Sequence, residues 1–167
     1  MKQILATLAL ALPMAAFSAD ATPDAAFYKS AAQGGIAEVD AATLAEQKSD
    51  NASVKDFAAM MVKDHSAAND KLKSIASSKN LSLPTSPSVR QMATKAKLDM
   101  LSGETFDKSY IKAMIKDHQQ TIALFKKEAM SGEDTDAKAF AAATLPTLRS
   151  HLKKINSIAA SAGVTSN

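Results

Sequence analysis

The sequence predicts an all-α fold, an antiparallel four-helix bundle with an extra short helix between the second and third long helices. Alanine, lysine, leucine, glutamate and methionine, all good helix formers, dominate the chain. Five glycines and five prolines among 167 residues are too few turn residues for a many-stranded β fold. Apolar residues recur with the spacing of a helix face, and the alternation typical of strands is absent.

The first 21 residues have the layout of a secretory signal peptide. Lys2 precedes an apolar run at 4–17, and small residues follow this run. Cleavage is expected after Ala21 or after Ser18, because both positions satisfy the small-x-small rule. The run is too short for a membrane span and contains a proline. We therefore expect a bacterial periplasmic protein in which residues 22–167 form a single helical domain.

Start and stop signals divide the rest of the chain into five helices. The expected long helices cover about 22–49, 53–79, 104–130 and 134–162, and the short helix covers about 89–101. Thr22 followed by Pro23 is typical of a helix start, and Ser53 with Asp56 resembles a capping box. The segment 80–88 is the clear connector and fits one long crossover.

Two features inside the expected helices predict local irregularities. Gly34 and Gly35 interrupt the first long helix, where they are expected to permit close packing or a bend. Pro146 predicts a kink near Thr144 in the last helix, because proline removes one backbone hydrogen bond and crowds the preceding turn.

One motif occurs twice in the chain. Residues 57–65 and 110–118 both read aromatic, three residues, Met, branched aliphatic, Lys, Asp, His. The Met and His of each copy are four residues apart, so they share a helix face, and the Asp borders that face. The residues concerned are Met61, Asp64 and His65 in the first copy and Met114, Asp117 and His118 in the second.

The three histidines of the protein lie on core-facing stripes near the middle of their helices. His65, His118 and His151 fall within about one turn of a common plane, at ~1.5 Å rise per residue. Glu38 is close to the midpoint of the first long helix. Four-helix proteins place metal ions at mid-bundle. The sequence therefore predicts a metal-binding cluster at this level.

Three imidazoles with flanking thioethers suit copper or zinc, because Met favours Cu(I) and imidazole accepts both metals. The candidate metal-site residues are His65, His118, His151, Met61, Met114, Asp64, Asp117 and Glu38. Asp64 and Asp117 are expected to orient imidazoles on neighbouring helices rather than to bind the ion. In the alternative interpretation, the histidines form a metal-free polar layer with these acids and Asn69 that fixes the helix register.

Four motifs resemble a family of exported bacterial helical proteins: MVKDHSAAN at 61–69, SGETFDKSY at 102–110, MIKDHQ at 114–119 and TLPTLRSHL at 144–152. That family is a ferritin-like domain of unknown function, often labelled a membrane or outer-membrane protein. The resemblance covers about 24–162 and implies a ferritin-like bundle without implying a particular activity. A more distant resemblance is to exported copper-binding bundles, whose denser His-His and Met-rich pattern is missing here.

Several functions lack their sequence requirements. The chain has no cysteine for a thiolate site, and Val62 and Ile115 stand where di-iron sites need the glutamate of Glu-x-x-His. A net charge of +3 with only two arginines argues against specific nucleic-acid binding and favours at most weak attraction to anionic envelope surfaces. No catalytic motif is present. We expect a non-catalytic exported protein that binds copper or zinc in an envelope-stress role, or else a metal-free structural or interaction module of the envelope.

Overall fold

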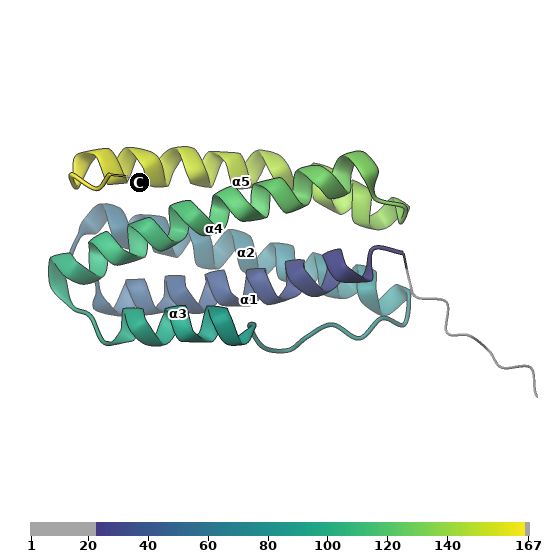
Figure 1. The fold of residues 1–167 in the computed structure, drawn as a ribbon, viewed down its shortest axis with the longest axis horizontal. Coiled ribbons are helices and arrows are strands. Elements are labelled where there is room, and N and C mark those ends of the chain that lie inside the picture. The colour runs from purple at the N-terminus through teal and green to yellow at the C-terminus, as the bar shows by residue number, and fades with distance from the viewer. Residues whose placement is uncertain (1–22, 166–167) are drawn as a thin grey trace, which may run out of the picture.

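The computed structural model describes residues 23–165, and the expected signal peptide lies outside this range. Its helices are α1 (Ala25–Lys48), α2 (Ala52–Ser78), α3 (Val89–Asp99), α4 (Gly103–Ser131) and α5 (Thr135–Ser161). The four long helices lie side by side along the long axis of the molecule, and the short α3 packs against α1 and α4 (Figure 1). The predicted all-α fold with a short helix before the third long helix is confirmed. Across 23–165 no helix is both long and apolar enough for a membrane span.

Each long helix contacts two neighbours, so the four form a ring in the order α1, α2, α5, α4. The pairs α1–α2 and α4–α5 are antiparallel hairpins, and the segment after α2 carries the chain back along the bundle to α3 (Figure 1). This single crossover places α2 and α4 on opposite corners of the ring. Because both start at the same end of the bundle, α2 and α4 are parallel (Figure 1).

The start of α1 differs from the expected Thr22-Pro23 signal. Helical residues begin only at Ala25, and Asp24 adopts a left-handed conformation with φ of 63°. The carboxylate of Asp24 instead accepts hydrogen bonds from the backbone N–H groups of Glu133 and Asp134, each at 2.7 Å. Asp24 therefore ties the start of α1 to the turn between α4 and α5.

The start of α2 is set by Asn51, two residues before the predicted cap. Asn51 accepts hydrogen bonds from the backbone N–H groups of Ser53 and Val54, so the expected capping box at Ser53 is wrong. Ser88 and Gln91 form a capping box at the start of α3.

Gly35 marks a close approach of α1 to α2, and α1 is continuous through it. A Cβ atom at Gly35 would lie 1.9 Å from Oδ1 of Asn69, so the expected close packing is confirmed there. Helix α5 is likewise continuous through Pro146.

The hydrophobic core consists of two clusters, which a polar layer separates. Phe57, Phe106 and Tyr110 belong to one cluster, and Phe27 and Phe125 belong to the other. On each long helix, the residues of the two clusters lie on either side of one buried polar residue. These four polar residues are Glu38, His65, His118 and His151.

Candidate metal centre

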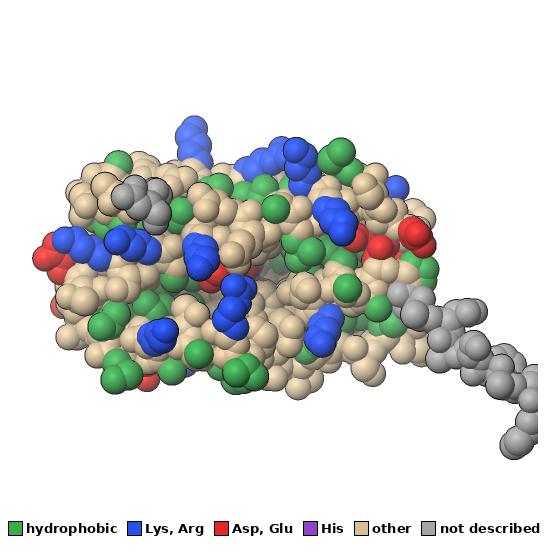
Figure 2. All heavy atoms as spheres, in the orientation of Figure 1, with side chains coloured by type: hydrophobic (Ala, Val, Ile, Leu, Met, Phe, Trp, Pro, Cys, Tyr) green, Lys and Arg blue, Asp and Glu red, His purple; other side chains and the backbone are tan. Residues whose placement is uncertain are grey.

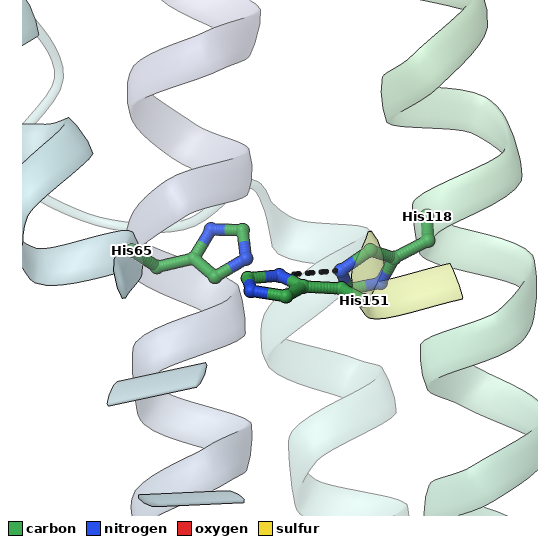
Figure 3. A group of neighbouring side chains, drawn as sticks. All are labelled: His65, His118 and His151. Carbon is green, nitrogen blue, oxygen red and sulfur yellow. Dashed lines mark hydrogen bonds between the residues drawn. The ribbon is translucent and has the colours of Figure 1, made fainter. Parts of the chain in front are cut away.

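Each of the four long helices contributes one side chain to the polar layer. Glu38 comes from α1, His65 from α2, His118 from α4 and His151 from α5, with exposed fractions of 3%, 5%, 0% and 1%. The three rings point toward one another across the bundle axis (Figure 3). Their centroids form a nearly equilateral triangle, with separations of 5.7 Å, 5.3 Å and 5.5 Å. One nitrogen of each ring lies within 4.8 Å of the other two.

The outward nitrogen of every ring has a hydrogen-bond acceptor. Nδ1 of His65 donates to Oε2 of Glu38 at 3.0 Å, and Nε2 of His151 donates to Oδ2 of Asp64 at 3.0 Å. Nδ1 of His118 donates to the backbone carbonyl of Met114 at 2.9 Å. Because a carboxylate or carbonyl oxygen can only accept, these contacts place the ring protons on the outward nitrogens.

The inward nitrogens are therefore left as lone pairs when the imidazoles are neutral. Nε2 of His118 and Nδ1 of His151 face each other at 3.4 Å (Figure 3). Nε2 of His65 is buried and has no hydrogen-bond partner among the described residues. Buried polar atoms are seldom left without a partner. A single cation between the rings would satisfy all three nitrogens.

Burial and nearby charges shift the pKa values of the three histidines in two directions. Burial alone lowers the pKa of His65, but the adjacent Glu38 carboxylate outweighs burial and raises it above its ordinary value. Burial lowers the pKa of both His118 and His151, and the charge of His65 adds to this effect. Burial also acts to raise the pKa of Glu38, but the three histidines outweigh it and hold this pKa low. The layer thus favours an ionised Glu38 and neutral rings at His118 and His151.

The three inward nitrogens are suitable metal ligands, and their separations are close to those of nitrogens bound to one ion. Ligand nitrogens bound to one zinc ion at about 2.0–2.1 Å lie roughly 3.3–3.5 Å apart. The separation of 3.4 Å between His118 and His151 already matches this spacing. Because the widest spacing can reach 4.8 Å, His65 would have to move inward by up to roughly 1.5 Å to complete the site. Acceptors on the outward nitrogens are typical of metal-binding histidines, whose orientation and basicity they set.

The structure places Asp64 and Glu38 against the rings, as acceptors on the outward nitrogens. Met61 and Met114 are buried in the core cluster beside the layer, where the backbone carbonyl of Met114 contacts His118. Phe57, which the sequence pattern does not mark as a site residue, has its ring centroid 6.4 Å from that of His118 and 6.3 Å from that of His151. Phe57 thus excludes water from one side of the cluster.

Asp117 is not brought to an imidazole. It lines a surface cleft between α1, α3 and α4, together with Glu38 and Arg90. Burial, and next the charge of Glu38, raise the pKa of Asp117, while Arg90 acts in the opposite direction. No hydrogen bond joins Asp117 to a histidine among the described residues, because the helix that Asp117 faces carries the carboxylate of Glu38 at this level.

The fold and the site define a helical-bundle protein with a buried three-histidine layer. The chain belongs to the family described as Domain of unknown function (DUF4142), whose profile matches residues 9–158. Among curated proteins, none matches the sequence.

Solved structures of low sequence identity share the fold. A DUF305 protein of Streptomyces coelicolor, described as a candidate secreted protein, has a TM-score of 0.74 at 15% identity, covering 86% of this chain and 96% of that one. A DUF305 fragment from Deinococcus radiodurans has a TM-score of 0.72 at 15% identity, covering 81% and 93%. CopM in its Cu(I)-bound form has a TM-score of 0.69 at 15% identity, covering 83% and 96%. At this identity the similarity shows the fold alone.

Proposed function

We propose that this protein is a non-catalytic metal-binding protein that holds one copper or zinc ion between His65, His118 and His151. The observation that carries the proposal is the division of ring nitrogens into outward donors with acceptors and inward atoms that converge. Glu38 and Asp64 hold two of the rings in the required orientation and add negative charge near the ion. The buried site would exclude water from the bound ion.

The choice between metals rests on charge and ligand type. Three neutral imidazoles suit both Zn²⁺ and copper. The two nearby carboxylates balance the charge of a divalent ion, whereas a thioether from Met61 or Met114 would favour Cu(I). The similarity to CopM in its Cu(I)-bound form supports copper as one of the two candidates.

We place the protein in the periplasm, with residues 1–21 acting as the signal peptide and 22–167 forming the ferritin-like bundle. The leader-like sequence and the similarity to a candidate secreted protein of Streptomyces coelicolor support this location. A metal-binding protein in this compartment would buffer copper or zinc during envelope stress.

The test is metal uptake by protein purified from the periplasm without an affinity metal. Elemental analysis and equilibrium dialysis against Cu⁺, Cu²⁺ and Zn²⁺ should give one ion per chain and a raised melting temperature. His118→Ala should abolish both effects, whereas Gln119→Ala, an exposed neighbour on the same helix, should retain them. If the wild type binds none of these ions, the proposal is wrong.

The alternative function is a metal-free structural or interaction module of the envelope. The buried contact between Glu38 and His65 at 3.0 Å favours it, because an ionised pair there would satisfy the layer without a metal. In that case a chelator would leave the melting temperature unchanged. Association with anionic envelope fractions would weaken with added salt.

A further inference from the structure

The face of the molecule shown in Figure 2 is hollowed between α1 and α4, next to the start of α3. This cleft has a volume of about 300 Å³, and its lining includes Gly34, Glu38, Arg90, Asp117 and Thr121. A second cavity of about 30 Å³ lies inside the bundle and is lined by Glu38 and His65. Gly34, Glu38 and Thr121 line both spaces, so the cleft and the inner cavity adjoin.

Glu38 lies at the junction of the two spaces and accepts a hydrogen bond through only one of its carboxylate oxygens. Oε2 accepts the hydrogen bond from His65, whereas Oε1 is buried, lies 3.7 Å from Nδ1 of His118 and has no hydrogen-bond partner among the described residues. The side chain as a whole is only 4% exposed. A buried carboxylate oxygen without a partner is costly unless a donor or a cation visits it.

Asp117 supplies a second carboxylate on the wall of the same cleft. It is half-buried and close enough to Glu38 for the charge of each to affect the other. Two carboxylates that repel each other in a cleft together attract a cation from solution. Asp117 is nearer the solvent, and Glu38 is nearer the histidines.

We propose that the cleft between α1, α3 and α4 is the route by which the metal ion reaches the three histidines, with Asp117 as its outer and Glu38 as its inner carboxylate. This inference rests on the proposed metal-binding function. It gives a role to the free oxygen of Glu38 and to the position of Asp117 away from the rings. The ion passes Glu38, enters the inner cavity and meets the ring of His65.

Removing the charge of Arg90 should change the rate of metal uptake in the opposite direction from removing the charge of Asp117. Arg90 lines the cleft and is exposed, and its guanidinium donates to Oε1 of Gln120 at 3.4 Å. Its positive charge repels an incoming cation. Loss of the Arg90 charge should therefore speed metal uptake, whereas loss of the Asp117 charge should slow it.

The experiment measures the kinetics and the equilibrium of binding on the same purified metal-free protein. Zn²⁺ and Cu⁺ are each supplied in stopped flow from a coloured chelator, and affinity is measured by chelator competition. For Asp117→Asn we expect association and dissociation each to slow by about three- to tenfold, with the dissociation constant unchanged. For Arg90→Gln we expect association about two- to fivefold faster, and added salt should reduce both differences.

Two matched variants control for charge and for space. Asp70 lines a different groove, between α2 and the crossover, so Asp70→Asn removes the same charge without changing the rates. At Gly34 a Cβ atom would lie 3.9 Å from Nε2 of Gln91, an ordinary contact that leaves room for a side chain. Gly34→Leu should fill the cleft and slow uptake at least fivefold, whereas Gly34→Ala should leave it nearly unchanged.

Three outcomes would overturn the route. Equal rates for Asp117→Asn, Asp70→Asn and the wild type would show that the ion enters elsewhere, for example past Asp64, whose side chain is 34% exposed. A tenfold loss of equilibrium affinity in Asp117→Asn would make Asp117 a ligand rather than a transit residue. If the wild type binds no metal, both proposals fail. If binding depends on His118 but its rates are the same in all cleft variants, only the proposed route is wrong.

Discussion

Replacing Glu38 by glutamine should change how many protons are released when the metal binds. In the metal-free protein, Nδ1 of His65 lies 3.0 Å from Oε2 of Glu38, and both residues are buried. At an effective dielectric constant of about 20, opposite charges at this distance attract by roughly 5 kcal/mol. Together with the hydrogen bond to Glu38 and the charge of Asp64, this attraction outweighs the cost of burying the imidazolium, so the pKa of His65 is raised above its ordinary value. At any pH below this raised pKa, the metal must therefore displace a proton from His65.

We expect the wild type to release more protons per bound ion than Glu38→Gln at the same near-neutral pH. The glutamine oxygen still accepts the hydrogen bond from Nδ1, but without the carboxylate charge, burial lowers the pKa of His65. Affinity alone is a poor readout, because two effects oppose each other. Each unit by which the pKa of His65 falls below its wild-type value strengthens binding at neutral pH by up to about 1.4 kcal/mol. Loss of a carboxylate behind a ligand weakens binding by roughly 10–100-fold.

The assay is isothermal titration calorimetry of Zn²⁺ binding in two buffers of different ionisation enthalpy, which together give the proton count. Asp40→Asn, which removes the same charge two residues further along α1, is the matched control and should release as many protons as the wild type. Equal proton release by Glu38→Gln and the wild type would refute the assignment of the displaced proton to His65.

Three further predictions concern the metal-free fold. Because burial lowers the pKa of His118 and His151, stability should fall below about pH 6.5, and because the pKa of His65 is raised, stability should fall again at higher pH. Denaturant unfolding across pH would test this, and Glu38→Gln should lose the decline on the alkaline side. Burial, followed by the charge of Asp24, raises the pKa of Glu128 to about 7, so Glu128→Gln should stabilise the protein by about 1 kcal/mol at pH 8 and change little at pH 4. Gly35→Ala should destabilise by roughly 1–3 kcal/mol in thermal unfolding, because its Cβ would meet Asn69. In an Asn69→Ala background the same substitution should instead stabilise by about 0.5–1 kcal/mol, and a loss in both backgrounds would contradict the steric explanation.

The sequence was sufficient to predict the helices and the level of the histidines, because both follow from spacing along a single chain. Each His lies near the middle of a long amphipathic helix, so packing these helices side by side brings the rings to one plane. Helix starts were less predictable. Asn51 and Ser53 are both good capping residues, and which of them caps α2 depends on the direction of the chain as it leaves α1. The partner of each ring depends on which helices are neighbours, and this requires the topology.

The duplicated motif explains why Asp64 and Asp117 have different environments. Its copies lie on α2 and α4, which are parallel and occupy opposite corners of the ring (Figure 1). A half-turn about the bundle axis that carries α2 onto α4 also carries α5 onto α1, so Asp64 faces α5 and Asp117 faces α1. Helix α5 presents His151 at this level, and Asp64 accepts its hydrogen bond. Helix α1 presents Glu38 instead, which repels Asp117, so a cleft lined by two carboxylates lies on this side of the histidine layer.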